Sequence, residues 1–304
     1  MIRNQNQIDL HTHTSRSDGS FSPTQLVDYA IRKELSAIAI TDHDTTDGLD
    51  EAISYAALLR SQGKPSTEVI PGIEFSTEYE GKDVHVVGLY ISYDAPAFQA
   101  QLDAFVESRI NRNIKMCARL QGAGIDITYE KLQAENPGAV ITRAHYAAYL
   151  HSHGYVRSRA EAFDRYLGDH TPYFIPREKV TPIQAVHLIL DAGGVPILAH
   201  PPLYHMGKDR LHKLVASLKE AGLMGIEALY STYTNQDEND MRKLADEFHL
   251  LLSGGSDFHG DNKPGLDLGT GYGRLFVPEE LLAPIKAAHT AVLERAKHYT
   301  PELK

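Results

Sequence analysis

Residues 8–13 read IDLHTH, a short apolar strand pattern that ends in two histidines. Residues 37–44 read AIAITDHD and repeat this arrangement, because polar residues again follow a buried strand pattern. Between the two segments an amphipathic helix is expected to begin at Pro23, with Ser22 as its N-cap. Strand, helix and strand in this order predict a parallel sheet with helices packed outside it.

The strand patterns continue after this unit and resume towards the end of the chain. Residues 68–79 and 84–90 are expected to form two strands joined by a hairpin connection at 80–82. This alternation of patterns favours an α/β fold. Further strands are expected at 195–199, 225–229 and 250–253, with helices near 182–190, 211–221 and 237–248 and a final helix over 278–298.

The middle of the chain changes to helical patterns. One long helix is expected over 96–122, and shorter helical pieces follow through residue 169 with few strand signals. We therefore expect three segments: a first barrel part, 1–95, a helical insertion that caps the substrate, 96–180, and a second barrel part, 181–304.

The composition narrows the class of protein. The chain has 304 residues, a formal net charge of −10 and a single cysteine, Cys117. The negative charge argues against binding to double-stranded DNA or to a membrane surface, because such proteins carry basic patches. No segment approaches the roughly 20 apolar residues of a membrane span, and residues 1–7 lack the apolar region of a signal peptide. We expect a cytoplasmic protein without an obligatory protein partner.

Histidines and carboxylates gather directly after the expected strands. His11 and His13 lie two residues apart on an extended strand and therefore point to the same side, where both can reach one ion. Asp18 adds a carboxylate nearby, and nitrogen with carboxylate ligands suits Zn²⁺, Mn²⁺ or Fe²⁺ better than Ca²⁺ or Mg²⁺. A lone pair of this kind would more often be two polar residues at a strand end. Here the pattern recurs at other strand ends, in His43, Glu74, His85, His200, Asp257 and His259.

These segments resemble the PHP (polymerase and histidinol phosphatase) family of metal-dependent phosphoesterases. The matching motifs run from residue 9 to residue 259, which is almost the whole chain. The resemblance implies a distorted (β/α)7 TIM-like barrel with a helical insertion domain, and two or three divalent ions at the C-terminal mouth of the barrel. It implies nine metal ligands, with Glu74 bridging two ions: His11, His13, Asp18, His43, Glu74, His85, His200, Asp257 and His259.

Closer still, the chain resembles the branch that acts on 3′,5′-nucleoside bisphosphates and on short RNA 5′ ends. That branch carries a helical insertion and an Arg-x-His motif, matched here by Thr142-Arg143-Ala144-His145. The resemblance implies that Arg143 and His145 reach over the metals and bind a phosphate of the substrate. A guanidinium can hold two phosphate oxygens as a fork, which a lysine does less well.

The expected activity is therefore hydrolysis of the 3′-phosphate of nucleoside 3′,5′-bisphosphates to nucleoside 5′-monophosphate and phosphate, or 5′–3′ trimming of short RNA, or both. The expected mechanism is attack of a metal-bound hydroxide on phosphorus, with Asp257 and His200 near the reacting centre. Manganese is the expected metal, and iron and zinc are the alternatives. Two other functions remain open: a phosphatase for a small metabolite such as histidinol phosphate, and a nucleotide-binding module that turns over nothing.

Several further residues have two interpretations each. Arg109, Arg112, Lys115 and Arg119 share one helical face, which either binds a second phosphate or, as we favour, faces solvent. Glu227 ends an expected strand and is a candidate for orienting a metal ligand. One side chain at most is expected to stack on a base, among Tyr146, Tyr149, Tyr155, Tyr166, Tyr173 and Phe174.

Overall fold

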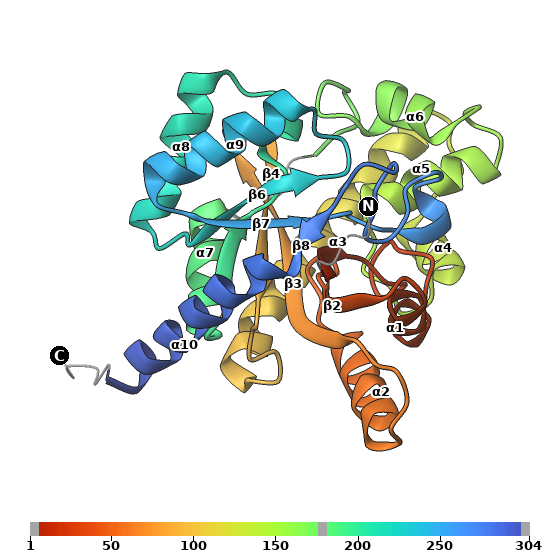
Figure 1. Cartoon of the computed structure of the whole chain (residues 1–304). Helices are drawn as coiled ribbons and strands as arrows, with labels where there is room; N and C mark the ends of the chain where they lie inside the picture. Colours follow the sequence, from red (N-terminus) through yellow and green to blue (C-terminus); the bar gives the residue numbers. More distant parts are fainter. Residues whose placement is uncertain (1–5, 176–180, 299–304) are drawn as a thin grey trace.

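One curved sheet organises the protein, whose computed structural model describes residues 6–175 and 181–298. The strands of this described part follow the order β7-β6-β5-β4-β3-β2-β1-β8, and the sheet curls into a nearly closed barrel (Figure 1). The N–H of His13 donates to the carbonyl of Phe258, and the N–H of Asp257 donates to that of His11, so the end of β7 returns to β1. The strands are β1 (Gln7–Thr12), β2 (Leu35–Ile40), β3 (Glu68–Tyr79), β4 (Lys82–Leu89), β5 (Val195–Leu198), β6 (Gly225–Tyr230), β7 (Leu251–Gly255) and β8 (Val277–Pro278).

Strand direction explains why the barrel is distorted. β1, β2 and β3 are parallel neighbours, and so are β5, β6 and β7. β4 is antiparallel to both β3 and β5, because a hairpin rather than a helical crossover joins it to β3. The predicted distorted α/β barrel is confirmed, and the hairpin at 80–82 is the point where it departs from a regular one.

Side chains alternate between the two faces of each strand, and so they pack into two separate apolar cores, one inside the barrel and one between the sheet and the outer helices. In β2, Ala37 and Ala39 belong to the same buried cluster as Ile8 of β1, whereas Ile38 and Ile40 pack with the helices outside. Ser22 caps the first outer helix as expected, and its hydroxyl accepts from the N–H of Gln25. The outer helices are α1 (Pro23–Arg32), α2 (Leu49–Ser61), α7 (Pro182–Asp191), α8 (Lys208–Glu220), α9 (Asn235–Phe248) and α10 (Leu282–His298).

The expected final helix over 278–298 starts later than predicted. Val277 and Pro278 form the short strand β8, which pairs antiparallel with Ile8 and Gln7 of β1. A 3₁₀ turn, η4 (Glu279–Leu281), follows before α10 begins at Leu282. The pairing of Pro278 with β1 and the turn after it therefore take up residues 278–281, which the sequence assigned to the helix.

The helices between β4 and α7 form a packed body beside the barrel (Figure 1). The long helix α3 (Pro96–Gly122) has the predicted bounds, and its first turns place Phe98 and Leu102 in the barrel's outer core. Its later turns pack on a separate buried cluster that includes Met116 and the fully buried Tyr146. Residues 176–180 of the expected insertion lie outside the described residues, as do 1–5 and 299–304. The other elements here are α4 (Tyr129–Glu135), α5 (Arg143–Ser152), α6 (Arg159–Ala162) and the π-helix η1 (Phe163–Leu167).

None of the described helices combines the length and the apolar character that a membrane crossing requires.

Candidate metal centre

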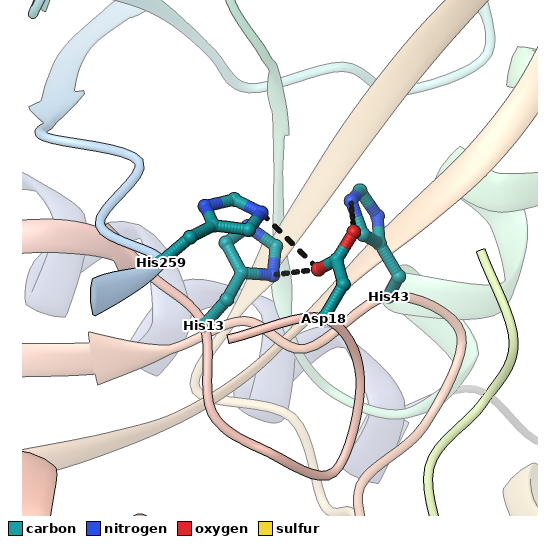
Figure 2. A group of neighbouring side chains, drawn as sticks. All are labelled: His13, Asp18, His43 and His259. Carbon is teal, nitrogen blue, oxygen red and sulfur yellow. Dashed lines mark ion pairs between the residues drawn. The ribbon is translucent and has the colours of Figure 1, made fainter. Parts of the chain in front are cut away.

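The nine residues predicted as metal ligands converge at one end of the barrel. Every one of them belongs to at least one compact group whose potential ligand atoms lie within 4.8 Å of one another. Figure 2 shows the largest group, in which Asp18 lies between three imidazole rings. The groups are His13–Asp18–His43–His259, His11–Glu74–His200, His11–His13–Asp257 and His43–Glu74–His85.

The first pair follows from strand geometry. His11 lies in the buried part of β1 and His13 just beyond the end of the strand, and their ring centroids are 5.2 Å apart. Thr12 between them points the other way, since its hydroxyl donates to the carbonyl of Ala39 at 2.6 Å. The period of two along β1 therefore places both imidazoles on the same side, as the sequence predicts.

Glu74 occupies the middle of the cluster. It lies at the mouth on β3, and its carboxylate is almost fully buried. Both of its oxygens face imidazole nitrogens, which is the arrangement that a bridging carboxylate requires. Oε2 is 3.3 Å from Nε2 of His11 and His13 and 3.0 Å from Nδ1 of His43, and Oε1 is 2.9 Å from Nδ1 of His85 and 3.0 Å from Nε2 of His200.

The donor atoms fit divalent cations. Among the described residues, Nε2 of His11, both ring nitrogens of His13 and Oδ1 of Asp18 are buried without a hydrogen-bond partner. Leaving such atoms unpaired in the interior costs roughly 1–3 kcal/mol each. A metal ion between imidazole nitrogens and carboxylate oxygens that face a common space would bind these atoms and remove this energetic penalty. The cluster therefore fits divalent metal ions.

The electrostatics of the cluster favour positive charge. Burial alone would lower the pKa of His11, but Glu227, Glu74 and Asp257 outweigh it and raise this pKa well above its usual value. Burial opposes a raised pKa at His13 too, yet Asp257 and Glu74 raise it to about 9. A buried group of carboxylates thus attracts protons that a bound divalent cation would displace. At His43, burial lowers the pKa to about 3, which keeps the ring neutral, the form that binds metals.

Side chains behind the cluster orient its members. Oε1 of Glu227, on β6, is 2.8 Å from Nδ1 of His11, and its Oε2 accepts from the backbone N–H of His200 at 2.7 Å. This is the orienting role that the sequence suggested for Glu227. Oδ2 of Asp257 accepts from the Tyr230 hydroxyl and from the Lys263 ammonium, at 2.5 Å each. Oδ1 of Asp257 is left to face the rings.

Backbone strain also marks the site. His200 and Asp257 adopt left-handed backbone conformations, with φ of 30° and 56°. Non-glycine residues pay a conformational cost there and keep such angles where the surrounding structure fixes them, often at functional sites.

The sequence profile of the PHP domain matches residues 9–171, more than half of the chain. The chain belongs to the PHP domain family. A 5′-3′ exoribonuclease of Haemophilus influenzae is 38% identical to it over 253 residues, which are 83% of this chain and 90% of the relative. The 3′,5′-nucleoside bisphosphate phosphatase of Chromobacterium violaceum is 35% identical over 264 residues, 86% of this chain and 90% of the relative.

A solved structure has the same fold. An amidohydrolase from Chromobacterium violaceum, with bound sulfate and no metal, superposes with a TM-score of 0.79 at 33% identity, over 91% of this chain and 96% of that one. The family resemblance predicted from the motifs is thereby confirmed for this PHP domain.

A cavity of about 420 Å³ opens over the cluster of this PHP domain. Among the nine predicted ligands in the described structure, its lining includes Asp18, His43, His85 and His259. Asp257 and His200, which we expected near the reacting centre, are not among the described lining residues. Basic side chains complete the cavity wall, namely Arg109, Arg112, Arg143, Arg159 and Lys263.

The two predicted phosphate-binding residues differ in position. Arg143 lines the cavity, where it pairs with Asp83 and lies 5.3 Å from the ring centroid of Phe174. His145 is not among the described lining residues. It is 6% exposed, and its Nδ1 accepts from the N–H of Thr142, which closes a capping box at the start of α5. Burial lowers the pKa of His145. The phosphate contact expected of this ring stays a prediction.

The solvent-facing interpretation of the basic face on α3 is wrong for half of its members. Arg109 and Arg112 are buried and line the cavity. Lys115 is exposed, and Arg119 is exposed while its guanidinium donates to the carbonyls of Pro172 and Phe174. The helical period groups these residues correctly, but it does not state how far along the helix the cavity extends.

Several residues of the site were not found from the sequence. Phe163 of η1 lines the cavity and is 37% exposed, whereas only Phe174 among the aromatic candidates named above does so in the described structure. Lys263 lies four residues after His259, a proximity that could have identified it. Asp42 accepts from the N–H of Thr14 at 2.7 Å and from the Ser17 hydroxyl at 2.5 Å, and so holds the loop that carries Asp18.

Proposed function

We propose that this PHP domain removes the 3′-phosphate of nucleoside 3′,5′-bisphosphates, leaving the nucleoside 5′-monophosphate, and that the same site shortens RNA from its 5′ end. The observation that carries the proposal is a metal-ligand cluster beneath a cavity with basic walls, in a chain whose net charge is −10. A wall of this kind attracts a phosphorylated substrate against the overall charge. The names of the two relatives, one a bisphosphate phosphatase and one an exoribonuclease, support this choice of substrate.

The proposed cofactor is a set of two or three divalent ions held by the nine converging residues, with manganese the expected metal and iron or zinc the alternatives. When bound, such ions lower the pKa of water towards about 7 and offset negative charge on the phosphoryl oxygens. Glu74, which faces imidazoles with both oxygens, would join two ions. A cytoplasmic location and the absence of an obligatory partner stay predictions.

The chain's own basic groups would hold the phosphates. Arg143 now pairs with Asp83. Burial by itself raises the pKa of the Asp83 carboxyl, but the charge of Arg143 outweighs this effect and holds the pKa below its usual value. A phosphate dianion would compete with Asp83 for the guanidinium fork. Arg112 and Arg159, on the same cavity wall, would receive the second phosphate, and the rings of Phe163 and Phe174 offer apolar surface for a base.

Residues 96–180 would act as a substrate cap. The described part of this segment supplies four of the basic residues on the cavity wall, Arg109, Arg112, Arg143 and Arg159. The guanidinium of Arg159 donates to the backbone carbonyl and to the side-chain oxygen of Asn262, at 2.9 and 3.1 Å, which fastens α6 to the loop after β7. A charged substrate bound below would thus contact the cap and the barrel together.

The test is phosphate release by the manganese-loaded protein from adenosine 3′,5′-bisphosphate, AMP and histidinol phosphate, measured side by side. We expect rapid release from the bisphosphate with AMP left as the product, followed by shortening of a 5′-phosphorylated RNA trimer. Preference for histidinol phosphate would replace the proposed substrate and keep the metal chemistry. Tight binding of AMP without any phosphate release would favour a nucleotide-binding module instead.

A further inference from the structure

The helical insertion contacts Asp18, one of the candidate ligands drawn in Figure 2. Thr142, the N-cap of α5, is 5% exposed, and its hydroxyl donates to Oδ2 of Asp18 at 2.9 Å. Oδ1 of Asp18 has no hydrogen-bond partner and lies 3.1 Å from Nε2 of His259. Oδ2, which accepts from Thr142, also lies 3.8 Å from Nε2 of His43. The Thr142 hydroxyl therefore holds the carboxylate in place between the rings of His43 and His259.

A second contact from the insertion supports His43. Arg109 on α3 is 4% exposed, and its guanidinium forms a buried ion pair with Asp44 and donates to the Ser76 hydroxyl at 2.7 Å. The Ser76 hydroxyl in turn is 3.4 Å from Nδ1 of His43, and the N–H of Ser76 donates to Oδ1 of Asp44 at 3.1 Å. Arg109 thus holds both the residue that follows His43 and the hydroxyl beside its ring.

A residue of the barrel supports a second group of the cluster. We call His13–Asp18–His43–His259 the outer group and His11–Glu74–His200 the inner group. Glu227 of β6 contacts both His11 and the backbone of His200 in the inner group. These supporting contacts come from the sheet, whereas Thr142 and Arg109 come from the insertion. The described contacts from the insertion thus reach members of the outer group, and Glu74, which faces rings of both groups, is where the two groups meet.

We propose that Thr142 and Arg109 are positioning residues through which the insertion sets the affinity of the ion in the outer group, while the inner group binds its ion independently of the insertion. The inference rests on the proposed metal centre. Residues that orient a metal ligand typically change metal affinity by about 10–100-fold when they are removed. Loss of either contact should weaken one ion by that factor and leave the other ion unchanged.

The test measures Mn²⁺ binding to the metal-free protein by calorimetry, with bound metal per chain measured after dialysis. Thr142→Val removes the hydroxyl and Thr142→Ser keeps it. Ser76→Ala removes the link to His43 and leaves the Arg109–Asp44 pair in place. Thr142→Val and Ser76→Ala should each weaken one ion about 10–100-fold, and Thr142→Ser should bind like the wild type. Glu227→Gln should weaken the other ion.

Thr128→Val is the matched control for the lost helix cap. Thr128 caps α4 through its hydroxyl, which accepts from the N–H of Lys131, so this variant loses a cap of the same kind in the same insertion. It should bind both ions normally. Circular dichroism of each metal-free variant establishes folding, and Ser76→Ala carries the test if Thr142→Val does not fold.

Equal affinities in the wild type, Thr142→Val and Ser76→Ala would overturn the inference and leave the proposed function intact. Equal weakening of every ion in these variants would overturn it too, since the two groups would then not be independent. A wild-type protein that binds no divalent ion would overturn the proposed function itself. The three results are distinguishable because the wild-type titration is measured first.

Discussion

A single carboxylate makes the metal centre continuous. Glu74 faces imidazoles of both the inner and the outer group, so its two oxygens connect sites that would otherwise be separate. In the described structure its carboxylate oxygens lie within 3.3 Å of nitrogens of five imidazole rings. No other described side chain of the cluster contacts as many rings. Charge, rather than shape alone, is what Glu74 contributes.

The variant Glu74→Gln keeps the size of this side chain and removes its negative charge. We expect it to lose at least one ion per chain and at least about 100-fold in phosphoesterase activity, because an amide is a poor bridge between cations. Bound metal per chain and the initial rate of phosphate release measure both effects. Glu220→Gln on the surface of α8 is the matched control and should leave both unchanged. Full metal content with full activity in Glu74→Gln would remove Glu74 from the centre.

Arg143 gives a different prediction, because it contacts the cavity and not the cluster. Arg143→Ala should raise the KM of a bisphosphate about 10–100-fold, the value of a lost charge-assisted hydrogen bond, with metal content unchanged. Arg143→Lys should recover only part of the loss, since an ammonium does not form the fork. Steady-state kinetics of both variants, with Arg119→Lys as the control, separate KM from kcat. Loss of metal in Arg143→Ala would show that Arg143 supports the centre instead.

At the scale of elements, the sequence predicted what local patterns encode. α3 has the expected bounds, Ser22 caps α1, and the nine residues expected as ligands lie together at one end of the barrel. The sequence did not predict contacts between elements that are far apart along the chain. The start of α10 is displaced by β8 pairing with β1, and the depth of the cavity decides that Arg112 is buried while Lys115 is exposed. His145 was assigned to phosphate from its motif, but the same spacing also forms a capping box with Thr142.

The seam between β7 and β1, where Gly255 packs against His11, has no room for a side chain at Gly255. A Cβ at Gly255 would lie 2.5 Å from the backbone nitrogen of His11 and 2.8 Å from Oδ1 of Asp9. We expect Gly255→Ala to displace β1, to destabilise the protein by about 1–3 kcal/mol through overpacking and to reduce bound metal, because His11 moves with the strand. Urea unfolding and metal content measure the two effects.

Gly122→Ala supplies the comparison for that variant. Gly122 is the last residue of α3, and a Cβ there meets no atom within 4 Å. This substitution should leave bound metal unchanged and should not lower stability, since alanine favours helix over glycine. A Gly255→Ala protein as stable as Gly122→Ala would show that the seam can widen freely.

At the scale of the molecule, the net charge and the local charge have opposite signs. The chain carries −10 overall, yet the cavity wall presents arginines from the insertion and Lys263 from the barrel. Elsewhere acidic residues tie segments together. Asp267 accepts from the Tyr29 hydroxyl and from the Lys33 ammonium, at 2.6 Å each, and so joins the loop before β8 to α1.

This junction makes a defined contribution to acid stability. Burial raises the pKa of Asp267, but the hydrogen bonds from Lys33 and Tyr29 outweigh it and lower the pKa below 3.8. A lowered pKa stabilises the fold at neutral pH, and this contribution is lost as the pH falls below about 4. Asp267→Asn should therefore lower the free energy of unfolding by less than about 1 kcal/mol at pH 7, because the pair is partly exposed. The substitution should not change it once Asp267 is protonated.

Urea unfolding of the wild type and of Asp267→Asn at pH 7, 5 and 3.5 measures this difference. Asp103→Asn, on an exposed position of α3, is the control and should match the wild type at every pH. A difference between wild type and Asp267→Asn that grows on acidification would contradict the assignment.

The order of the ligands along the chain has a consequence for biosynthesis. The outer group joins His13 to His259, so a nascent chain has no complete outer group until residue 259 has left the ribosome. The stretch up to His85 already contains His43, Glu74 and His85, a partial set that an early ion could occupy. Filling of the whole centre would therefore follow the synthesis of His259, and a product terminated before this residue would remain without the complete centre.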